Sequence, residues 1–198
     1  MPTSIGHALA GAAAAWGADL VPGDRAWRSA PPPASWYQRA GNGLTLTCVL
    51  LAAVPDADLL LRTHRTFSHS VGGVIVVGVS AAVLASFSKR PIARVALMCA
   101  AAYATHLLLD YLAADTVPPI GIQALWPFSH AWYISGWDLF LQTERRHFLS
   151  LATIWINTRA ALQELFIIGP IALALWLVRV KALARLAAQM PGGDHPPQ

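Results

Sequence analysis

The stretch that decides the fold is IARVALMCAAAYATHLLLDYLAA, residues 92–114, which is apolar over almost its whole length. A helix needs about 20 mainly apolar residues to cross the hydrocarbon core of a bilayer, and this stretch is long enough. Its ionisable residues lie near the ends, with Arg94 at the start and His106 and Asp110 toward the finish. The pattern predicts a spanning helix that carries an imidazole and a carboxylate near one membrane surface.

The composition of the whole chain favours the same environment. Of 198 residues, 56% are hydrophobic and 12% are charged, about half the roughly 25% charged share of a soluble domain. The length suits one domain. We therefore expect an all-α integral membrane bundle of four to five membrane-entering helices, with a single embedded domain over 1–190 and a disordered tail at 191–198.

The apolar runs predict where the helices lie. The segment 19–43 is polar and is broken by Pro22 and by PPP at 31–33, so it is expected to be a loop. The segment 115–160 is a long connection rich in aromatic residues. The second helix is too short to cross alone, so a re-entrant segment is the alternative there. The expected helices are 4–18, 44–55, 71–88, 93–114 and 161–180.

The basic residues predict an orientation. If all five helices enter the membrane, the N-terminus, the 56–70 segment and the 115–160 connection share one side. The opposite side then holds Arg25, Arg28, Arg39, Lys89, Arg90, Arg94, Arg179, Lys181 and Arg185. The first side holds Arg62, Arg65, Arg145, Arg146 and Arg159. The positive-inside rule assigns the richer side to the cytoplasm, so the polar segments are expected on the non-cytoplasmic side.

Three other features of the sequence have ordinary interpretations. The net charge of +4 comes from scattered arginines, which suit a membrane surface and not a nucleic-acid patch. Cys48 and Cys99 lie inside apolar runs and read as small buried residues, not as a disulfide or a zinc knuckle. The N-terminal ALAGAAAAWGA lacks the basic region of a signal peptide, so we expect it to be retained.

Polar groups interrupt the apolar pattern in a few short motifs. HLLLD places His106 and Asp110 four residues apart, on one face of a helix, where they can share a metal ion or simply bond to each other. HRTFSHS, residues 64–70, separates two histidines by about 140° around a helix, which favours a loop or a helix start. Ser68 or Ser70 is expected to cap the helix that follows.

The remaining polar residues have both ordinary and functional interpretations. Asp56 and Asp58 in PDAD suit a turn with a helix cap, or an oxygen-rich ligand set. Arg62 and Arg65 can contact a phosphate or lie at the level of the lipid headgroups. His7 lies near the start of the first predicted helix, and it falls on the same predicted side of the membrane as all of these motifs. They offer four imidazoles and three carboxylates, enough for one ion or a close pair: His7, Asp56, Asp58, His64, His69, His106 and Asp110.

Such a set predicts zinc foremost, with manganese or iron as alternatives, and a metal-activated water as the reactive group. The chain contains neither GxSxG nor a phosphate loop. The residues therefore favour metal-dependent hydrolysis over serine chemistry or nucleotide binding.

Four of these motifs together resemble a known family. GHALAG at 6–11, PDADLL at 55–60, HRTFSHS at 64–70 and HLLLDYLAADTVPPIGIQALWPFS at 106–129 look like the ordered motifs of the YdjM-like family. Its members are small bacterial inner-membrane proteins described as membrane-bound metal-dependent hydrolases. The resemblance implies metal binding at His64, His69, His106 and Asp110, with Asp58 and His7 as further ligands.

The resemblance also suggests a distant similarity to zinc phospholipase C and to single-strand nucleases, which use a comparable HxxxD. Two departures are visible. Ser68 stands where threonine is usual, and AADTVPP at 113–119 replaces the usual Thr-Pro or Thr-x-Gly turn. The second departure concerns the shape of the loop more than the ligands.

The connection WPFSHAWYISGWDLF, residues 126–140, is dense in amphipathic aromatic residues. Such residues suit an aromatic belt in the headgroup zone, and the alternative is a lid over the site. In the second case His130 is an acid–base residue or an extra ligand, while Arg65 contacts phosphate. The predicted activity is hydrolysis of a phosphoester in a lipid or lipid-linked substrate. A metal-binding scaffold or regulatory protein, and an ion- or proton-coupled transporter, are the alternatives.

Overall fold

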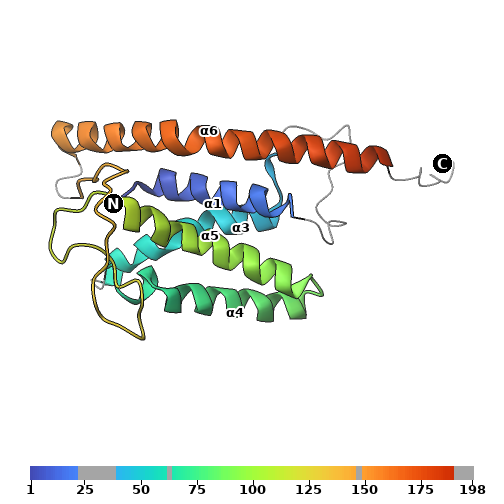
Figure 1. Ribbon diagram of the computed structural model, residues 1–198, viewed down its shortest axis with the longest axis horizontal. Helices are drawn as coiled ribbons and strands as arrows, with labels where there is room; N and C mark the ends of the chain where they lie inside the picture. Colours follow the sequence, from blue (N-terminus) through green and yellow to red (C-terminus); the bar gives the residue numbers. More distant parts are fainter. Residues whose placement is uncertain (22–38, 62–63, 146–148, 190–198) are drawn as a thin grey trace.

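The computed structural model describes residues 1–21, 39–61, 64–145 and 149–189 (Figure 1). Over these ranges the chain is all-α, as predicted, with no named strand and two isolated β-bridges. The α-helices are α1 (Ser4–Ala18), α3 (Gly43–Ala53), α4 (Val71–Phe87), α5 (Ile92–Leu112) and α6 (Leu151–Gln189). Two 3₁₀ helices, η1 (Val54–Leu61) and η2 (Phe67–His69), join α3 to α4.

The first four α-helices lie within about two residues of their predicted bounds, but the last one is longer than expected. We predicted 161–180 because polar residues at 157–159 and 163–164 seemed to break the pattern, and the prediction of the bounds was wrong. These polar residues do not end the helix, because their side chains have partners elsewhere. Asn157 bonds to Glu144, and Gln163 bonds to Leu139 and Leu141. The predicted tail at 191–198 and most of the predicted loop at 19–43 lie outside the described residues.

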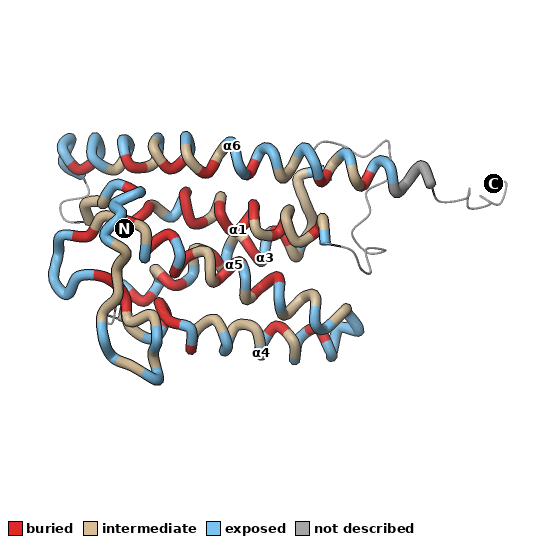
Figure 2. Tube along the Cα trace, in the orientation of Figure 1, coloured by how far each residue is buried: buried red, intermediate tan, exposed pale blue. Residues whose placement is uncertain are grey.

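The helices run side by side, with α6 along one flank and α4 along the other (Figure 1). Helix α1 packs against α3, α5 and α6, and α5 packs against α3 and α4. Because successive helices alternate in direction, the N-terminus, η1, η2 and the connection after α5 gather at one end of the bundle. Figure 2 shows that much of α1 is buried while the outer side of α6 is exposed.

Small residues let α1 occupy the centre of the bundle. Ala10, Ala12, Ala13 and Ala15 are all buried. At Gly11 the helices approach so closely that an added Cβ would lie 2.6 Å from Ala52 Cβ. Close contact between small side chains is a common way for membrane helices to gain packing energy.

Two polar contacts fix α6 to α1. At the end where η1 and η2 lie, the buried Glu164 carboxylate accepts hydrogen bonds from the Thr3 backbone and hydroxyl groups at the start of α1. At the other end Arg179 pairs with Asp19 at 2.7 Å, and both are buried. Charges inside an apolar bundle are costly unless they are paired in this way, so these contacts fix how the two helices align.

By length and composition, α5 and the Leu151–Arg185 part of α6 qualify as membrane spans, while α4 is a shorter apolar helix. The 39 residues of α6 correspond to about 58 Å of helix, well beyond the roughly 30 Å of a hydrocarbon core. Cys48 and Cys99 are free and buried, as predicted.

The contact at Gly11 gives a test of the packing. Gly11→Ala should destabilise the bundle by about 1–3 kcal/mol, because its Cβ would also lie 2.7 Å from the Cys48 carbonyl oxygen. Gly17→Ala is the matched control, since a Cβ there would meet Leu175 at an ordinary 3.9 Å. The apparent Tm of the detergent-solubilised protein measures both. Equal Tm values for the two variants would contradict the packing described.

Candidate metal centre

Four polar groups converge at the end of the bundle that carries η1 and η2. His106 and Asp110 come from the last turns of α5, His7 from the first turns of α1, and His69 from η2. All four side chains are buried. Asp110 lies at the centre: its Oδ1 is 3.5 Å from His7 Nε2, and its Oδ2 is 3.4 Å from His69 Nε2 and 3.2 Å from His106 Nε2.

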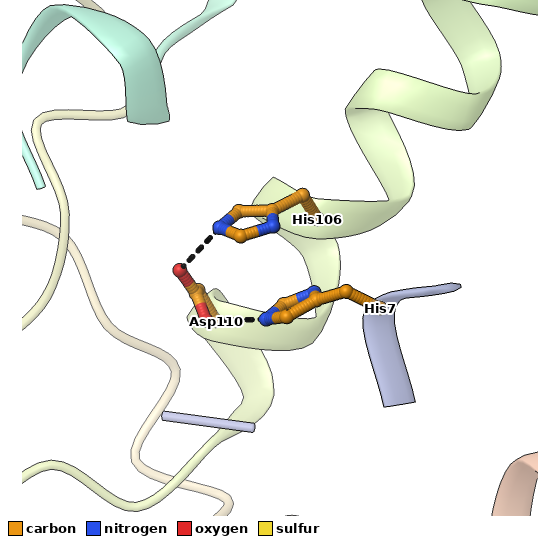
Figure 3. Close-up of side chains that lie close together, drawn as sticks. All are labelled: His7, His106 and Asp110. Atoms are coloured by element: carbon orange, nitrogen blue, oxygen red, sulfur yellow. Dashed lines mark ion pairs between the residues drawn. The ribbon is translucent and has the colours of Figure 1, made fainter. Parts of the chain in front are cut away.

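The local helix geometry accounts for this meeting. Residues four apart share a helix face, so HLLLD presents both of its polar side chains to α1. The rings of His7 and His106 stack, with centroids 3.7 Å apart and planes 19° from parallel. Figure 3 shows His7 and His106 lying side by side, each directed at the Asp110 carboxylate.

Hydrogen bonds at the far side of two rings fix their tautomers. His106 Nδ1 donates to the Ala52 carbonyl at 2.8 Å, and His69 Nδ1 donates to Asp58 Oδ2 at 3.1 Å. A neutral imidazole that donates from one nitrogen presents a lone pair at the other. The two Nε2 atoms nevertheless face each other at 3.0 Å. Such lone pairs repel unless a proton or a metal ion lies between them.

The cluster also contains buried polar atoms without hydrogen bonds. Within the described ranges, both ring nitrogens of His7 and both carboxylate oxygens of Asp110 lack a partner of acceptable geometry. Unsatisfied buried groups of this kind are costly. His7, His106 and Asp110 lie close enough together to hold one ion, and His69 Nε2 lies beside the same carboxylate. Imidazole nitrogens and a carboxylate suit zinc and related ions, so the residues present fit a divalent metal.

A second group lies beside the first. Asp58 Oδ1 accepts from His64 Nδ1 at 2.6 Å, so one carboxylate holds His64 and His69 together. His64 Nε2 accepts from Arg145 Nη1 at 2.6 Å, and Arg145 Nη2 donates to Asp56 Oδ1 at 3.3 Å. Both ring nitrogens of His64 are therefore engaged. Asp56, His64 and His69 also lie close enough together to hold an ion, so a ligand role for His64 stays a prediction that requires Arg145 to move.

The two serines of the HRTFSHS segment have different hydrogen-bond partners. Ser70 caps α4 by accepting from the Gly73 backbone at 3.2 Å, as predicted for one of them. Ser68 donates to Asp58 and lies 3.0 Å from His69 Nδ1. Tyr103 on α5 donates to the Ser68 carbonyl at 2.6 Å. The sequence predicts at most a capping role for Ser68, whereas in the structure its hydroxyl supports the Asp58 carboxylate that orients His69.

Arg65 and His130, the two predicted catalytic residues, lie elsewhere in the structure. The Arg65 guanidinium donates to Asp115 at 2.5 Å and to the Pro119 carbonyl at 3.1 Å. His130 is exposed on the connection. The structure thus does not bring either side chain to the four converging groups. Arg62 lies outside the described residues, as do Arg25, Arg28 and Arg146 from the topology argument.

Neighbouring charges and hydrogen bonds hold the ionisable groups of η1 and η2 in their charged forms. Burial opposes charge on His69, but Asp56 and Asp58 outweigh it and raise the pKa of His69 to about 9. Burial likewise opposes charge on Asp56, but His69, His106 and Arg145 lower its pKa to about 2. His64, His69 and Ser68 hold the pKa of Asp58 well below its usual value against the effect of burial.

A groove leads to this region from the surface. Its volume is about 730 Å³, and it lies between the first residues of α1, η1, the end of the connection and the first turns of α6. Asp56 and Arg145 line it. Asp56 Oδ1 is 3.8 Å from His69 Nε2 and 4.0 Å from His106 Nε2, so the groove meets the buried cluster at Asp56.

An apolar helical bundle with a buried histidine–aspartate cluster at one end defines a class: an all-α membrane protein with a set of potential metal ligands. The YdjM inner membrane protein family matches residues 1–186, and the chain belongs to that family. The predicted resemblance is thereby confirmed, and with it an inner-membrane protein associated with the lipid bilayer. No curated protein and no solved structure matches the chain.

The cluster predicts metal content directly. Detergent-purified wild-type protein should carry about one divalent ion per chain. His106→Ala and Asp110→Asn should each lose most of it, because each removes a group from the centre of the cluster. His130→Ala, which changes an exposed histidine, should retain it. Elemental analysis of the purified proteins measures all four, and full metal content in His106→Ala would argue against the centre.

The raised pKa of His69 predicts how the metal-free protein responds to pH. Its stabilising contribution is complete below 6.5 and is lost as the pH rises through about 9. Asp56 contributes a constant amount over this window, since its contribution is lost only as the pH falls toward about 2. In chelator, the apparent Tm should fall by several degrees between pH 6.5 and 9.

The control for this pH dependence is His69→Gln, which should show a much flatter profile over the same window. A saturating divalent ion should reverse the trend, because ligation needs the deprotonated ring. Parallel pH profiles for the wild-type and His69→Gln proteins would show that His69 is not the titrating group.

Proposed function

We propose that this protein is a membrane-bound, metal-dependent hydrolase of a phosphoester in a lipid or lipid-linked substrate. The observation that carries the proposal is the convergence of three imidazoles on the buried Asp110 carboxylate, whose two oxygens have no hydrogen bond within the described residues. His7, His69, His106 and Asp110 would hold the ion. A divalent ion supplies Lewis-acid polarisation of an oxygen and lowers the pKa of a water molecule.

The surrounding residues support this chemistry in defined ways. Asp58 and the Ala52 carbonyl orient His69 and His106 by accepting from their Nδ1 atoms, an arrangement typical of ligand histidines. Asp56, ionised and on the groove side of the cluster, can accept a hydrogen bond from a water molecule and orient it. Zinc is the first choice of metal, with manganese or iron as alternatives.

The setting supports a lipid substrate. The chain belongs to an inner-membrane family, and exposed apolar side chains surround the groove. Phe128 and Trp137 on the connection project outward with 82% and 77% of their surfaces exposed, which supports the aromatic-belt interpretation. We propose that four or five helices enter the membrane, with this end of the bundle on the non-cytoplasmic side.

A closed structural metal site is the second candidate. It is favoured by the complete burial of His7, His69 and His106, since structural ions are enclosed by protein ligands. The transporter alternative predicts polar groups near the middle of the membrane, whereas these lie at the end of the bundle (Figure 1).

Turnover in a bilayer separates the first two candidates. Full-length protein in lipid nanodiscs should release phosphate or headgroup from a lipid phosphoester, lose this activity in chelator, and regain it with zinc or manganese. Asp110→Asn should lower the rate by about 100-fold or more. Asp138→Asn, on an exposed residue of the connection, is the matched control. Metal-replete protein without turnover on any lipid phosphoester favours the structural site.

A further inference from the structure

The groove that meets the cluster at Asp56 has two kinds of wall. One is apolar, formed by Ile5 at the start of α1, Ala53 and Leu59 near η1, and Ile154 and Ala161 on α6. Ile5 and Ile154 are 62% and 49% exposed. In a protein of an inner-membrane family, such side chains suit contact with hydrocarbon. The other wall is polar and includes Arg145.

Arg145 has hydrogen-bonding capacity to spare. A guanidinium carries five N–H donors, and within the described ranges the Arg145 group donates to two atoms, His64 Nε2 and Asp56 Oδ1. Its side chain is 27% exposed and lines the groove. Planar guanidinium groups recognise phosphate through paired hydrogen bonds, so the remaining donors are suited to an anion in the groove.

The backbone before Arg145 is fixed by a side chain of α6. Asn157 Oδ1 accepts from the Glu144 backbone N–H at 2.8 Å, and Asn157 Nδ2 donates to the Glu144 carbonyl at 2.9 Å. Asparagine is a poor helix former, and this reciprocal pair explains its place inside a long helix. By holding Glu144, Asn157 fixes the point from which the Arg145 side chain starts.

We propose that Arg145 is the anion-recognition residue of this groove, and that the groove binds a phosphate-bearing amphiphile. The charged head lies at Arg145 and the apolar tail lies along Ile5 and Ile154, with Asn157 as a positioning residue. This inference rests on the proposed function, because it places the head beside Asp56 and the cluster. The Asp56 carboxylate opposes an anion, so binding is stronger when the cluster holds a divalent ion.

The test uses hexylphosphonate and methylphosphonate, whose C–P bonds are not esters, and isothermal titration of full-length protein in a neutral detergent with and without zinc. Hexylphosphonate should bind more tightly than methylphosphonate. Arg145→Gln should weaken both by roughly tenfold or more, Arg145→Lys should fall between, and zinc content should not change. Arg159→Gln, on an exposed arginine of the same helix as Asn157, should bind as wild type.

Two further variants test the tail and the positioning role. Ile154→Ser should weaken hexylphosphonate binding and leave methylphosphonate binding unchanged. Asn157→Ala should weaken binding of both, and adding it to Arg145→Gln should cause no further loss, because Asn157 acts through Arg145. Additive losses would overturn the positioning role.

The inference is overturned if Arg145→Gln binds hexylphosphonate as tightly as wild type. It is also overturned if hexylphosphonate and methylphosphonate bind equally, since the groove would then recognise free phosphate alone. Arg145-dependent binding by a protein that hydrolyses nothing would refute the proposed activity while supporting the amphiphile site. Turnover by a protein whose phosphonate binding does not depend on Arg145 would support the proposed activity and refute the amphiphile site.

Discussion

The arrangement depends on one electrostatic constraint: three imidazole rings converge on one carboxylate in a buried space. Asp110 is within 3.5 Å of three imidazole nitrogens yet accepts no well-formed hydrogen bond in the described structure. In a low-dielectric interior, this arrangement needs positive charge beside the carboxylate. A proton on His69, whose pKa is raised to about 9, supplies it in the metal-free protein, and a divalent ion would supply it under the proposed function. The supporting groups follow from that need, since Asp58 and the Ala52 carbonyl hold the rings of His69 and His106 so that their Nε2 atoms point inward.

Much of this could be predicted from the sequence because the signals were local. HLLLD fixed the relation of His106 to Asp110, and apolar runs located four of the helices to within about two residues. Alternation of helix direction then placed His7 and η2 at the same end. Other features depended on contacts distant in sequence. Ser68 could be recognised as a support for Asp58 only once η1 and η2 were seen together. Likewise, Asn157 looked like an interruption until Glu144 was found beside it.

The position of Arg145 in the site likewise depends on contacts that are distant in sequence. In the sequence it is one of several scattered arginines, and Arg65 seemed the better partner for phosphate because it lies inside a motif. In the fold Arg145 is the better placed of the two to contact an anion in the groove. Arg65 is paired with Asp115, whereas Arg145 contacts His64 and Asp56 beside the groove. A motif identifies residues that are close in the chain. Which cation faces the groove is decided by how the connection packs on α6.

Helix α5 carries part of the histidine–aspartate cluster and α6 lines the groove, and this order along the chain has a consequence for biosynthesis. All four converging groups have been synthesised once α5 is complete, whereas α6 supplies none of them. Helix α6 contributes the wall of the groove and the Asn157 contact that fixes the segment bearing Arg145. A growing chain therefore contains the potential ion-binding groups before it contains the helix that completes the groove. Under the proposed function, metal binding and completion of the groove would therefore be separate steps of biogenesis.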